Sequence, residues 1–214
     1  MNFERLAPHY AWMESVLAGG LMQRCRTEHL ARTKHCRCAL LVGEGTGRFL
    51  VALLRFNPRI KITCVEHSEK MMQQARQRLT RARLDRSQVQ FIHMDVLNWV
   101  PLAMKFDLVV THFFLDCFRA DQLEKLVPLL AGSTTTEALW LLADFRVPEN
   151  GWRRVRARLI LALLYTFFKF SSSLPASRLT PPDDFMRAVR FTLFERRYAS
   201  FGLVHSDVWV KSLQ

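Results

Sequence analysis

The sequence lacks any apolar run long enough to cross a membrane. Its longest strongly apolar stretch, LILALLYTFF from Leu159 to Phe168, has ten residues, whereas a spanning helix needs about 20. A secretory signal is also missing, because the opening residues MNFERLAPHY are polar and contain no apolar core. We therefore expect a cytoplasmic protein.

Acidic residues are scarce. The chain has 19 Asp and Glu residues against 31 Lys and Arg, which gives a formal net charge of +12 at pH 7. This excess favours association with polyanions, either nucleic acid or an anionic membrane face. Half of the residues are hydrophobic and 16 are Phe, so either the core is rich in aromatic side chains or some apolar surface contacts a lipophilic partner.

Cysteines are few and odd in number, five in all, which predicts a reducing compartment rather than a disulfide framework. The segment HCRC sets Cys36 and Cys38 beside His35, but tetrahedral metal sites need four well-spaced ligands and no second pair follows. We expect no metal.

Strand-like and helix-like segments alternate along the first two thirds of the 214 residues, a length that fits one domain. This alternation predicts an α/β fold with a parallel sheet and crossover helices on both faces. The final third predicts a long helix, a Ser- and Pro-rich link, a short helix and an antiparallel hairpin around Gly202. The expected strands are 38–43, 60–66, 89–95, 106–114 and 138–145, and the expected helices are 47–56, 68–83, 119–131 and about 152–170.

A glycine-rich turn, GEGTG from Gly43 to Gly47, follows the first strand directly. A strand that turns through glycines into a helix exposes backbone N–H groups and lets a nucleotide-containing cofactor approach the main chain. The dinucleotide pattern would need glycine where Arg48 stands, and the P-loop pattern is absent. A pyrophosphate cradle is therefore the weaker interpretation.

Two acids follow the next two strands. Glu66 comes 19 residues after Gly47, where one carboxylate can accept hydrogen bonds from both ribose hydroxyls; the alternative is a solvated glutamate at a strand end. Asp95 is placed to accept a hydrogen bond from an exocyclic amine. Val96 and either Met71 or Met72 offer apolar faces to an adenine, although core packing explains the methionines equally well.

Together these stretches resemble the class I S-adenosylmethionine-dependent methyltransferases. LLVGEGTG, VEHSEKMMQQAR, FIHMD and FDLVVTHFFLDCF occur in the order of that family's motifs, and FERLAPHYAWMESVL is similar to the lead-in of the ubiquinone and menaquinone biosynthesis methyltransferases. The resemblance implies S-adenosyl-L-methionine as cofactor and a Rossmann-like sheet of seven mostly parallel strands that ends in an antiparallel hairpin. The residues it assigns to the cofactor are Gly43, Glu44, Gly45, Thr46, Gly47, Glu66, His67, Met71, Asp95, Val96 and Thr111.

The resemblance also implies one methyltransferase domain over 1–214. Within it we expect an N-terminal helical cap (1–35), a cofactor-binding core (36–145), and substrate-side helices with an edge hairpin (146–214). One departure stands out, because the family usually carries an acid at the position of Leu41. Either Glu44 contacts the methionine ammonium instead, or another group does.

The catalytic groups are expected where the fourth strand ends, at the crevice beyond the carboxyl ends of the strands. His112 is the candidate general base, with Asp116 to orient it or to bind the acceptor; alternatively, both serve local structure. His9 and Tyr10, in the N-terminal cap, are second candidates.

The segment THFF stands where base and amide N-methyltransferases commonly carry [DN]-P-P-[YF]. It argues against those substrates and favours methyl transfer to O, C or S of a small apolar or aromatic acceptor, such as a quinone- or lipid-like molecule. An RNA methyltransferase, suggested by the charge, is one alternative although nucleic acid is not the expected partner. A catalytically inactive binding module, suggested by Leu41, is the other.

The expected helix over 152–170 combines apolar residues at helical spacing with arginines in its first turns. Cations near a helix N-terminus oppose the helix dipole, so helix stability does not explain them. A basic end leading into an apolar surface is typical of a helix that contacts anionic lipid, and we expect peripheral membrane contact there. The alternative is a helix that packs on the sheet with a solvated basic end.

Overall fold

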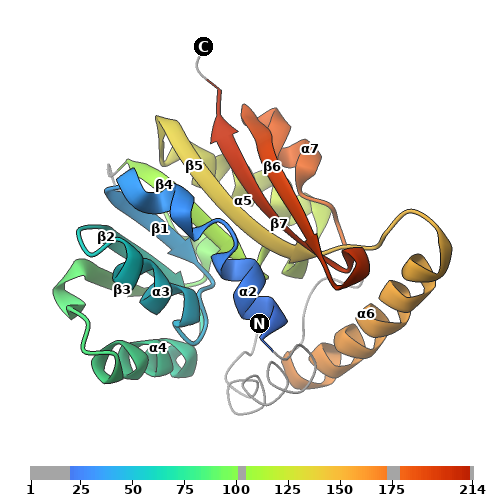
Figure 1. Cartoon of the computed structure of the whole chain (residues 1–214), viewed down its shortest axis with the longest axis horizontal. Coiled ribbons are helices and arrows are strands. Elements are labelled where there is room, and N and C mark those ends of the chain that lie inside the picture. The colour runs from blue at the N-terminus through green and yellow to red at the C-terminus, as the bar shows by residue number, and fades with distance from the viewer. Residues whose placement is uncertain (1–19, 101–104, 173–178, 213–214) are drawn as a thin grey trace.

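The computed structural model describes residues 20–100, 105–172 and 179–212, without the side chains of 163–172. Its centre is a seven-stranded sheet in the order β3-β2-β1-β4-β5-β7-β6 (Figure 1). The first five strands are parallel, and β7 runs antiparallel to both β5 and β6. The expected α/β sheet with its C-terminal antiparallel hairpin is confirmed. The strands are β1 (Cys38–Val42), β2 (Lys61–Glu66), β3 (Val89–His93), β4 (Phe106–His112), β5 (Thr134–Phe145), β6 (Phe191–Ala199) and β7 (Val204–Lys211).

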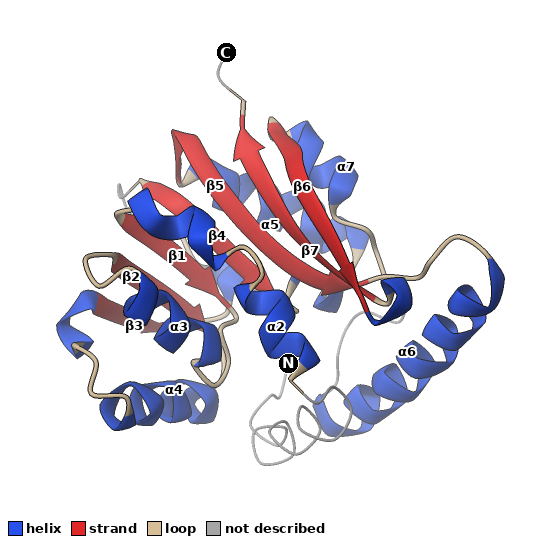
Figure 2. Cartoon of the chain, in the orientation of Figure 1, coloured by secondary structure: helices blue, strands red, loops and turns tan. Residues whose placement is uncertain are grey.

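Helices cover both faces of this sheet (Figure 2). Alternation along β1 shows why the faces need cover, because Ala39 and Leu41 are buried under one layer of helices and Leu40 and Val42 under the other. The first layer contains α2, α3 and α4, and the second contains α5 and α7. The helices are α2 (Leu21–Thr27), α3 (Arg48–Phe56), α4 (Glu69–Arg81), α5 (Ala120–Gly132), α6 (Gly151–Ser172) and α7 (Asp183–Ala188).

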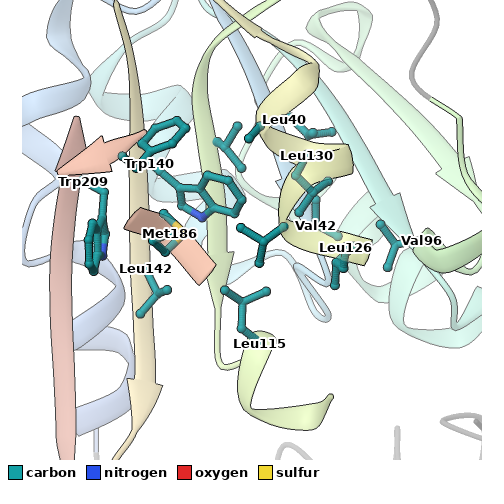
Figure 3. Close-up of a cluster of buried hydrophobic side chains, with 14 of the residues drawn as sticks. Leu40, Val42, Val96, Leu115, Leu126, Leu130, Trp140, Leu142, Met186 and Trp209 are labelled. Carbon is teal, nitrogen blue, oxygen red and sulfur yellow. The ribbon is translucent and has the colours of Figure 1, made fainter. Parts of the chain in front are cut away.

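The larger core cluster lies between the sheet and the α5–α7 layer (Figure 3). Trp140 of β5 and Trp209 of β7 are fully buried and opposite each other in register. Both rings lie on the same face as Leu142 and Met186. This aromatic packing fixes β7 against β5, so the antiparallel strand is an integral part of the sheet.

Several element boundaries lie two to four residues from their expected positions, and two of these differences have a clear structural cause. β5 begins at Thr134 rather than at 138, because Thr134 pairs with Phe106 across a register irregularity in β4. β4 ends at His112 rather than at 114, because Phe113 takes a φ of 54°. That left-handed conformation cannot continue a strand and is strained for a bulky residue.

Candidate active site

The carboxyl ends of the parallel strands meet at one edge of the sheet, where β7 begins. The loops after β1 and β2 lie at this edge beneath α2, and the loops after β4 and β5 lie beside the start of β7 (Figure 1). In an open α/β sheet this is the edge at which ligands bind. The candidate site therefore draws on loops that are distant in sequence.

Gly45 provides an open stretch of main chain in the turn after β1. It has a φ of 66°, and a Cβ built on it would meet no atom within 4 Å. Gly43 has the same φ, but a Cβ there would overlap the ring of Phe114. Gly43 thus gives space to a neighbouring side chain, whereas Gly45 leaves space into which a ligand can fit.

Glu66 connects this turn to the end of β2. Its Oε2 accepts a hydrogen bond from the Gly45 N–H at 2.9 Å, and its Oε1 accepts one from the Ser68 N–H at 2.9 Å. Burial raises the pKa of the carboxyl, although both backbone hydrogen bonds oppose that shift. Each oxygen has a second lone pair, so the carboxylate can still accept hydrogen bonds from a ligand hydroxyl.

Glu44 caps the helix that follows the turn. Its Oε1 accepts hydrogen bonds from the N–H groups of Phe49 and Leu50 at 2.9 and 3.0 Å, in the first turn of α3. The N-cap residue is Gly47, which has no side chain to serve this purpose. Burial raises the pKa of Glu44 to about 7, against the lowering effects of these N–H groups and of Arg26.

Replacing Glu44 by Ala should therefore destabilise the fold by about 1–2 kcal/mol, because two N–H groups lose their acceptor. Gln retains the acceptor oxygen, so Glu44→Gln should cost less than half as much. Urea unfolding at pH 7 measures both. Equal losses in the two variants would mean that the charge, not the cap, stabilises α3.

The adenine-side residues lie after β2 and β3. Asp95 is partly exposed, and its Oδ1 accepts a hydrogen bond from the Leu97 N–H at 3.0 Å, which caps a short 3₁₀ turn. The backbone carbonyl of His67 lies 2.9 Å from His93 Nε2. Met71 and Val96 are both buried, as expected for core packing. Contact between any of these residues and an adenine stays a prediction.

His112, the expected general base, is buried against the first helix layer. Its ring meets the Phe49 ring edge-on, with centroids 4.6 Å apart, and its Nδ1 has no hydrogen-bond partner in the described part of the chain. Burial lowers its pKa well below the usual value, and the nearby Arg26 and His29 lower it further. His112 is therefore neutral at pH 7 and a weak base.

Thr111 lies on the opposite face of β4. Its hydroxyl accepts a hydrogen bond of 2.8 Å from Trp140 Nε1, and both side chains are completely buried. The sequence pattern placed Thr111 with the cofactor, but this hydrogen bond commits the hydroxyl to the core. Thr111 therefore belongs to the core rather than to the candidate site.

Asp116 and Asp144 form a carboxyl pair that sequence reasoning recognised only in part. Asp144 ends β5, its Oδ1 accepts a hydrogen bond from the Phe114 N–H at 3.1 Å, and its Oδ2 is buried without a partner among the described residues. Burial and the neighbouring Asp116 raise the Asp144 pKa well above its usual value. Burial raises the Asp116 pKa to about 6. The raised pKa of Asp144 favours its protonated form beside Asp116.

A second cluster of polar side chains, centred on Asp207, lies on β7 next to this pair. His205 lies opposite Asp144 in register, and its Nδ1 is 2.9 Å from Asp207 Oδ1. Asp207 accepts two hydrogen bonds from Arg196, at 2.8 and 2.7 Å, and one from Trp209 at 3.2 Å. Burial opposes the charge on Asp207, but these donors lower its pKa. An ionised Asp207 requires His205 to carry a proton on Nδ1.

One feature of the sequence points to Asp144 as a candidate site residue. The segment ALWLLADF is apolar except for this acid, and a buried carboxyl near a strand end is a candidate for function. No comparable signal linked His205 and Asp207 to Asp144, because only the antiparallel pairing of β7 with β5 brings them to that strand.

His9 and Tyr10 lie outside the described residues, as does most of the expected N-terminal cap. Cys36 is buried, and burial with the nearby Asp107 raises its pKa to about 12. In the described ranges, no group of three or more His, Cys, Asp and Glu side chains is arranged to hold a metal ion.

Comparison with known proteins supports the motif assignments. Residues 39–133 match the family model of a methyltransferase domain. Carboxy-S-adenosyl-L-methionine synthase from Nautilia profundicola is 25% identical over 109 residues, which are 51% of this chain and 44% of that protein. The chain thus spans less than half the length of this curated relative.

Solved structures share the fold. An O-methyltransferase family protein from Burkholderia thailandensis superposes with a TM-score of 0.69 at 15% identity, over 96% of this chain and 59% of that chain. Magnesium protoporphyrin IX methyltransferase from Synechocystis PCC 6803, solved with bound SAH, gives 0.65 at 17% identity, over 91% and 84%. The resemblance to methyltransferases stated from the motifs is confirmed by the domain match over residues 39–133. The cofactor expected from the motifs, S-adenosyl-L-methionine (SAM), is in keeping with the SAH bound in the Synechocystis neighbour, whose fold this chain shares.

Proposed function

We propose that this chain, which has a class I SAM-dependent methyltransferase domain and fold, transfers a methyl group to O, C or S of a small apolar or aromatic acceptor. The observation that carries the proposal is the Asp116–Asp144 pair, which supplies an ionisable base beside the ligand-binding edge of the sheet. Asp116 lies in the loop after β4, and β4 is the neighbour of β1, the strand that leads into the open main chain of Gly45.

The residues present fit SAM in shape and in charge. Gly45 leaves room for a ligand against the main chain, and Glu66 beside it retains lone pairs for the ribose hydroxyls. Burial raises the pKa of both Glu44 and Glu66, so a ligand that brings positive charge favours their ionised forms. SAM has an ammonium and a sulfonium group, the latter of which supplies the methyl group.

We assign the base role to Asp116 rather than to His112. A general base works best when its pKa lies near the working pH, and Asp116 at about 6 meets that condition. Burial and Asp116 favour the protonated form of Asp144, so we assign the ionised role to Asp116. For a hydroxyl or thiol acceptor, Asp116 takes the proton as the methyl group is transferred. His112 is neutral, and its ring packs against that of Phe49 in α3.

Two phenylalanines set the character of the acceptor pocket. Phe113 and Phe114 follow β4 directly and are partly exposed at the site. The Phe113 ring lies 5.4 Å from the Phe145 ring, and the Arg26 guanidinium lies 5.1 Å from its centroid. This aromatic wall supports an apolar or aromatic acceptor. The O-methyltransferase neighbour from Burkholderia thailandensis is in keeping with an oxygen acceptor.

Cofactor binding is the first test. Replacing Glu66 by Ala should weaken binding of S-adenosylhomocysteine by roughly 10- to 100-fold, because a hydrogen bond to a charged group contributes about 1.5–3 kcal/mol. Titration calorimetry measures the affinity. Glu69→Ala is the matched control, since Glu69 begins α4 three residues later with a side chain 38% exposed.

An affinity within about threefold of the wild type in Glu66→Ala would remove Glu66 from the cofactor site. No binding by the wild type at all would favour the catalytically inactive module instead. Once binding is established, a screen of quinols, phenols, thiols and fatty acids with methyl-labelled SAM identifies the acceptor class.

An RNA methyltransferase is the second candidate, on one specific observation. A cavity of about 670 Å³ lies between α3 and α4 and has no Asp or Glu in its lining. Four arginines line it, namely Arg48, Arg55, Arg78 and Arg81. Guanidinium groups suit the phosphate groups of a nucleic-acid backbone. RNA binding whose affinity falls steeply with salt would support this candidate; salt-insensitive, weak binding supports the small acceptor.

A further inference from the structure

An apolar stripe runs along the exposed side of α6. Trp152, Val155 and Leu159 are 59%, 60% and 63% exposed, and their spacing of three and four residues places them on one side of the helix. The opposite side is anchored, because Ala157 and Leu161 are buried against Val204 and its neighbours. α6 lies beyond the edge of the sheet at which β5 ends rather than on either face, and it runs back toward the middle of the molecule (Figure 1).

A further apolar side chain, Phe201, lies next to this stripe in the turn between β6 and β7. Phe201 is 60% exposed, and its ring centroid lies 5.3 Å from that of Trp152. Its φ is 58°, and Ser200 and Gly202 on either side also have positive φ. A non-glycine residue held in this conformation is strained, and such strain concentrates at functional positions. Here it displays an aromatic ring to the outside.

Arg156 fixes the turn against the helix. Its Nη1 donates to the Ser200 carbonyl at 3.1 Å and its Nη2 to the Ser200 hydroxyl at 3.2 Å. The guanidinium also lies 5.4 Å from the centroid of the Phe201 ring. Helix and turn therefore form one surface, which we call the α6 patch: Trp152, Val155, Leu159 and Phe201.

Positive charge surrounds the α6 patch. Arg153, Arg154 and Arg158 are exposed on the same turns of α6, and the sequence has no Asp or Glu from 150 to 182. Arg154 donates to the backbone carbonyl of Glu149 at 3.2 Å, an interaction that leaves its charge unneutralised. Arginines in the first turns of a helix oppose the helix dipole, so a partner with negative charge explains them better than helix stability does.

We propose that the α6 patch docks the protein onto the surface of an anionic lipid bilayer. Trp and Phe side chains insert at the depth of the lipid headgroups, and arginines pair with anionic phosphates. A second copy of the chain fits less well, because two-fold pairing of this patch would bring like charges together. RNA does not require Val155 and Leu159 to be exposed.

The patch lies at the functional edge of the molecule. α6 follows the carboxyl end of β5, and the turn that carries Phe201 precedes the start of β7, which pairs with that end. Docking therefore turns the candidate active site toward the membrane. Figure 1 shows α6 on the same edge as the loops after β1 and β2. The binding itself is independent of the proposed methyl transfer.

The test is sedimentation with vesicles in the absence of cofactor. The wild type should bind phosphatidylcholine vesicles that contain about one third phosphatidylglycerol at least about tenfold more tightly than pure phosphatidylcholine vesicles. The variant Trp152→Ala/Phe201→Gly should bind the anionic vesicles at least about tenfold more weakly than the wild type, because two apolar side chains are removed. Glycine at 201 also relieves the backbone strain, so the thermal midpoint should not fall.

Two matched controls separate the patch from general effects. Phe194→Ala removes an aromatic ring that is also 60% exposed, on β6, and should bind like the wild type. Arg153→Gln/Arg154→Gln should weaken binding by roughly 30-fold, since each basic residue near an anionic surface contributes a factor of about five. Arg83→Gln/Arg86→Gln removes the same charge from the loop after α4 and should have little effect.

Three outcomes would overturn the proposal. The first is that the wild type binds neither kind of vesicle, or binds both equally tightly. The second is that the control variants lose as much vesicle affinity as the patch variants. The third is a dimer that light scattering detects in the wild type and not in Trp152→Ala/Phe201→Gly, without vesicle binding, which would make the patch an interface between copies.

Discussion

Asp116→Asn should lower the turnover number for a hydroxyl or thiol acceptor by roughly 10²- to 10⁴-fold, the contribution typical of a general base. Binding of S-adenosylhomocysteine should stay within about threefold of the wild type, because the amide is isosteric with the carboxyl and the charge of Asp116 is not needed to hold the cofactor. Steady-state kinetics and titration calorimetry measure the two effects separately.

The dependence of the methyl-transfer rate on pH provides a second test of Asp116. Asp116 acts as a base only when ionised, and burial raises its pKa to about 6. The wild-type rate should therefore rise through that pH, whereas the residual rate of Asp116→Asn should lack this limb. A limb that persists unchanged in the variant would transfer the base role to another group, with His205 as the next candidate.

Asp144→Asn is the matched control for Asp116→Asn. Burial and Asp116 raise the pKa of Asp144 and so favour its neutral form, and the amide oxygen can still accept the hydrogen bond from the Phe114 N–H, so turnover should change by less than about threefold. Because the folded-state pKa of Asp144 is raised, the wild type loses stability as pH rises above the unfolded-state value. Asn removes that loss, and the variant should melt higher than the wild type at pH 8.

Gly43→Ala should destabilise the protein by about 2–4 kcal/mol, because it combines a left-handed φ with a clash in a packed region. Its Cβ would overlap the Phe114 ring, which cannot withdraw without disturbing the loop after β4. The thermal midpoint should fall by roughly 5–15 °C for a chain of this size. Differential scanning calorimetry measures the shift.

Gly45→Ala separates backbone strain from the clash and from ligand exclusion. Gly45 has the same φ of 66° as Gly43, but a Cβ there meets nothing within 4 Å. We expect a stability loss of only about 1–2 kcal/mol. Affinity for S-adenosylhomocysteine should nevertheless fall at least about tenfold, since the methyl group occupies the open main-chain surface. Normal affinity in Gly45→Ala would place the cofactor elsewhere.

The core of the fold was predictable because local pattern and layer architecture agree. Five apolar strand-like runs alternate with helical segments, and that alternation permits few arrangements other than a parallel sheet with crossovers. The glycines of the turn after β1 and the acid at Glu66 were equally local signals. Their spacing alone identified the edge of the sheet at which they now lie.

Boundaries and roles that depend on an unusual backbone conformation or on a contact formed only in the fold were not predictable. The end of β4 depends on the left-handed φ of Phe113, and the start of β5 on pairing with β4. Glu44 caps α3 because Gly47, chosen for its backbone conformation, cannot. The hydrophobic pattern of the sequence does not show that Glu44, rather than the N-cap residue, caps the helix.

The sequence by itself determined the sheet, the glycine turn, Glu66 and Asp116, because periodicity, turn chemistry and strand-end position are local properties. Only the tertiary structure decided how deeply these side chains are buried and which charged groups lie beside them. It placed Asp144 and His205 behind Asp116 by pairing β5 with β7, and it brought Phe201 beside Trp152 by closing a hairpin against a helix 49 positions away. Burial and charge at these sites arise from neighbours across the sheet, and so does the chemistry that we assign to them.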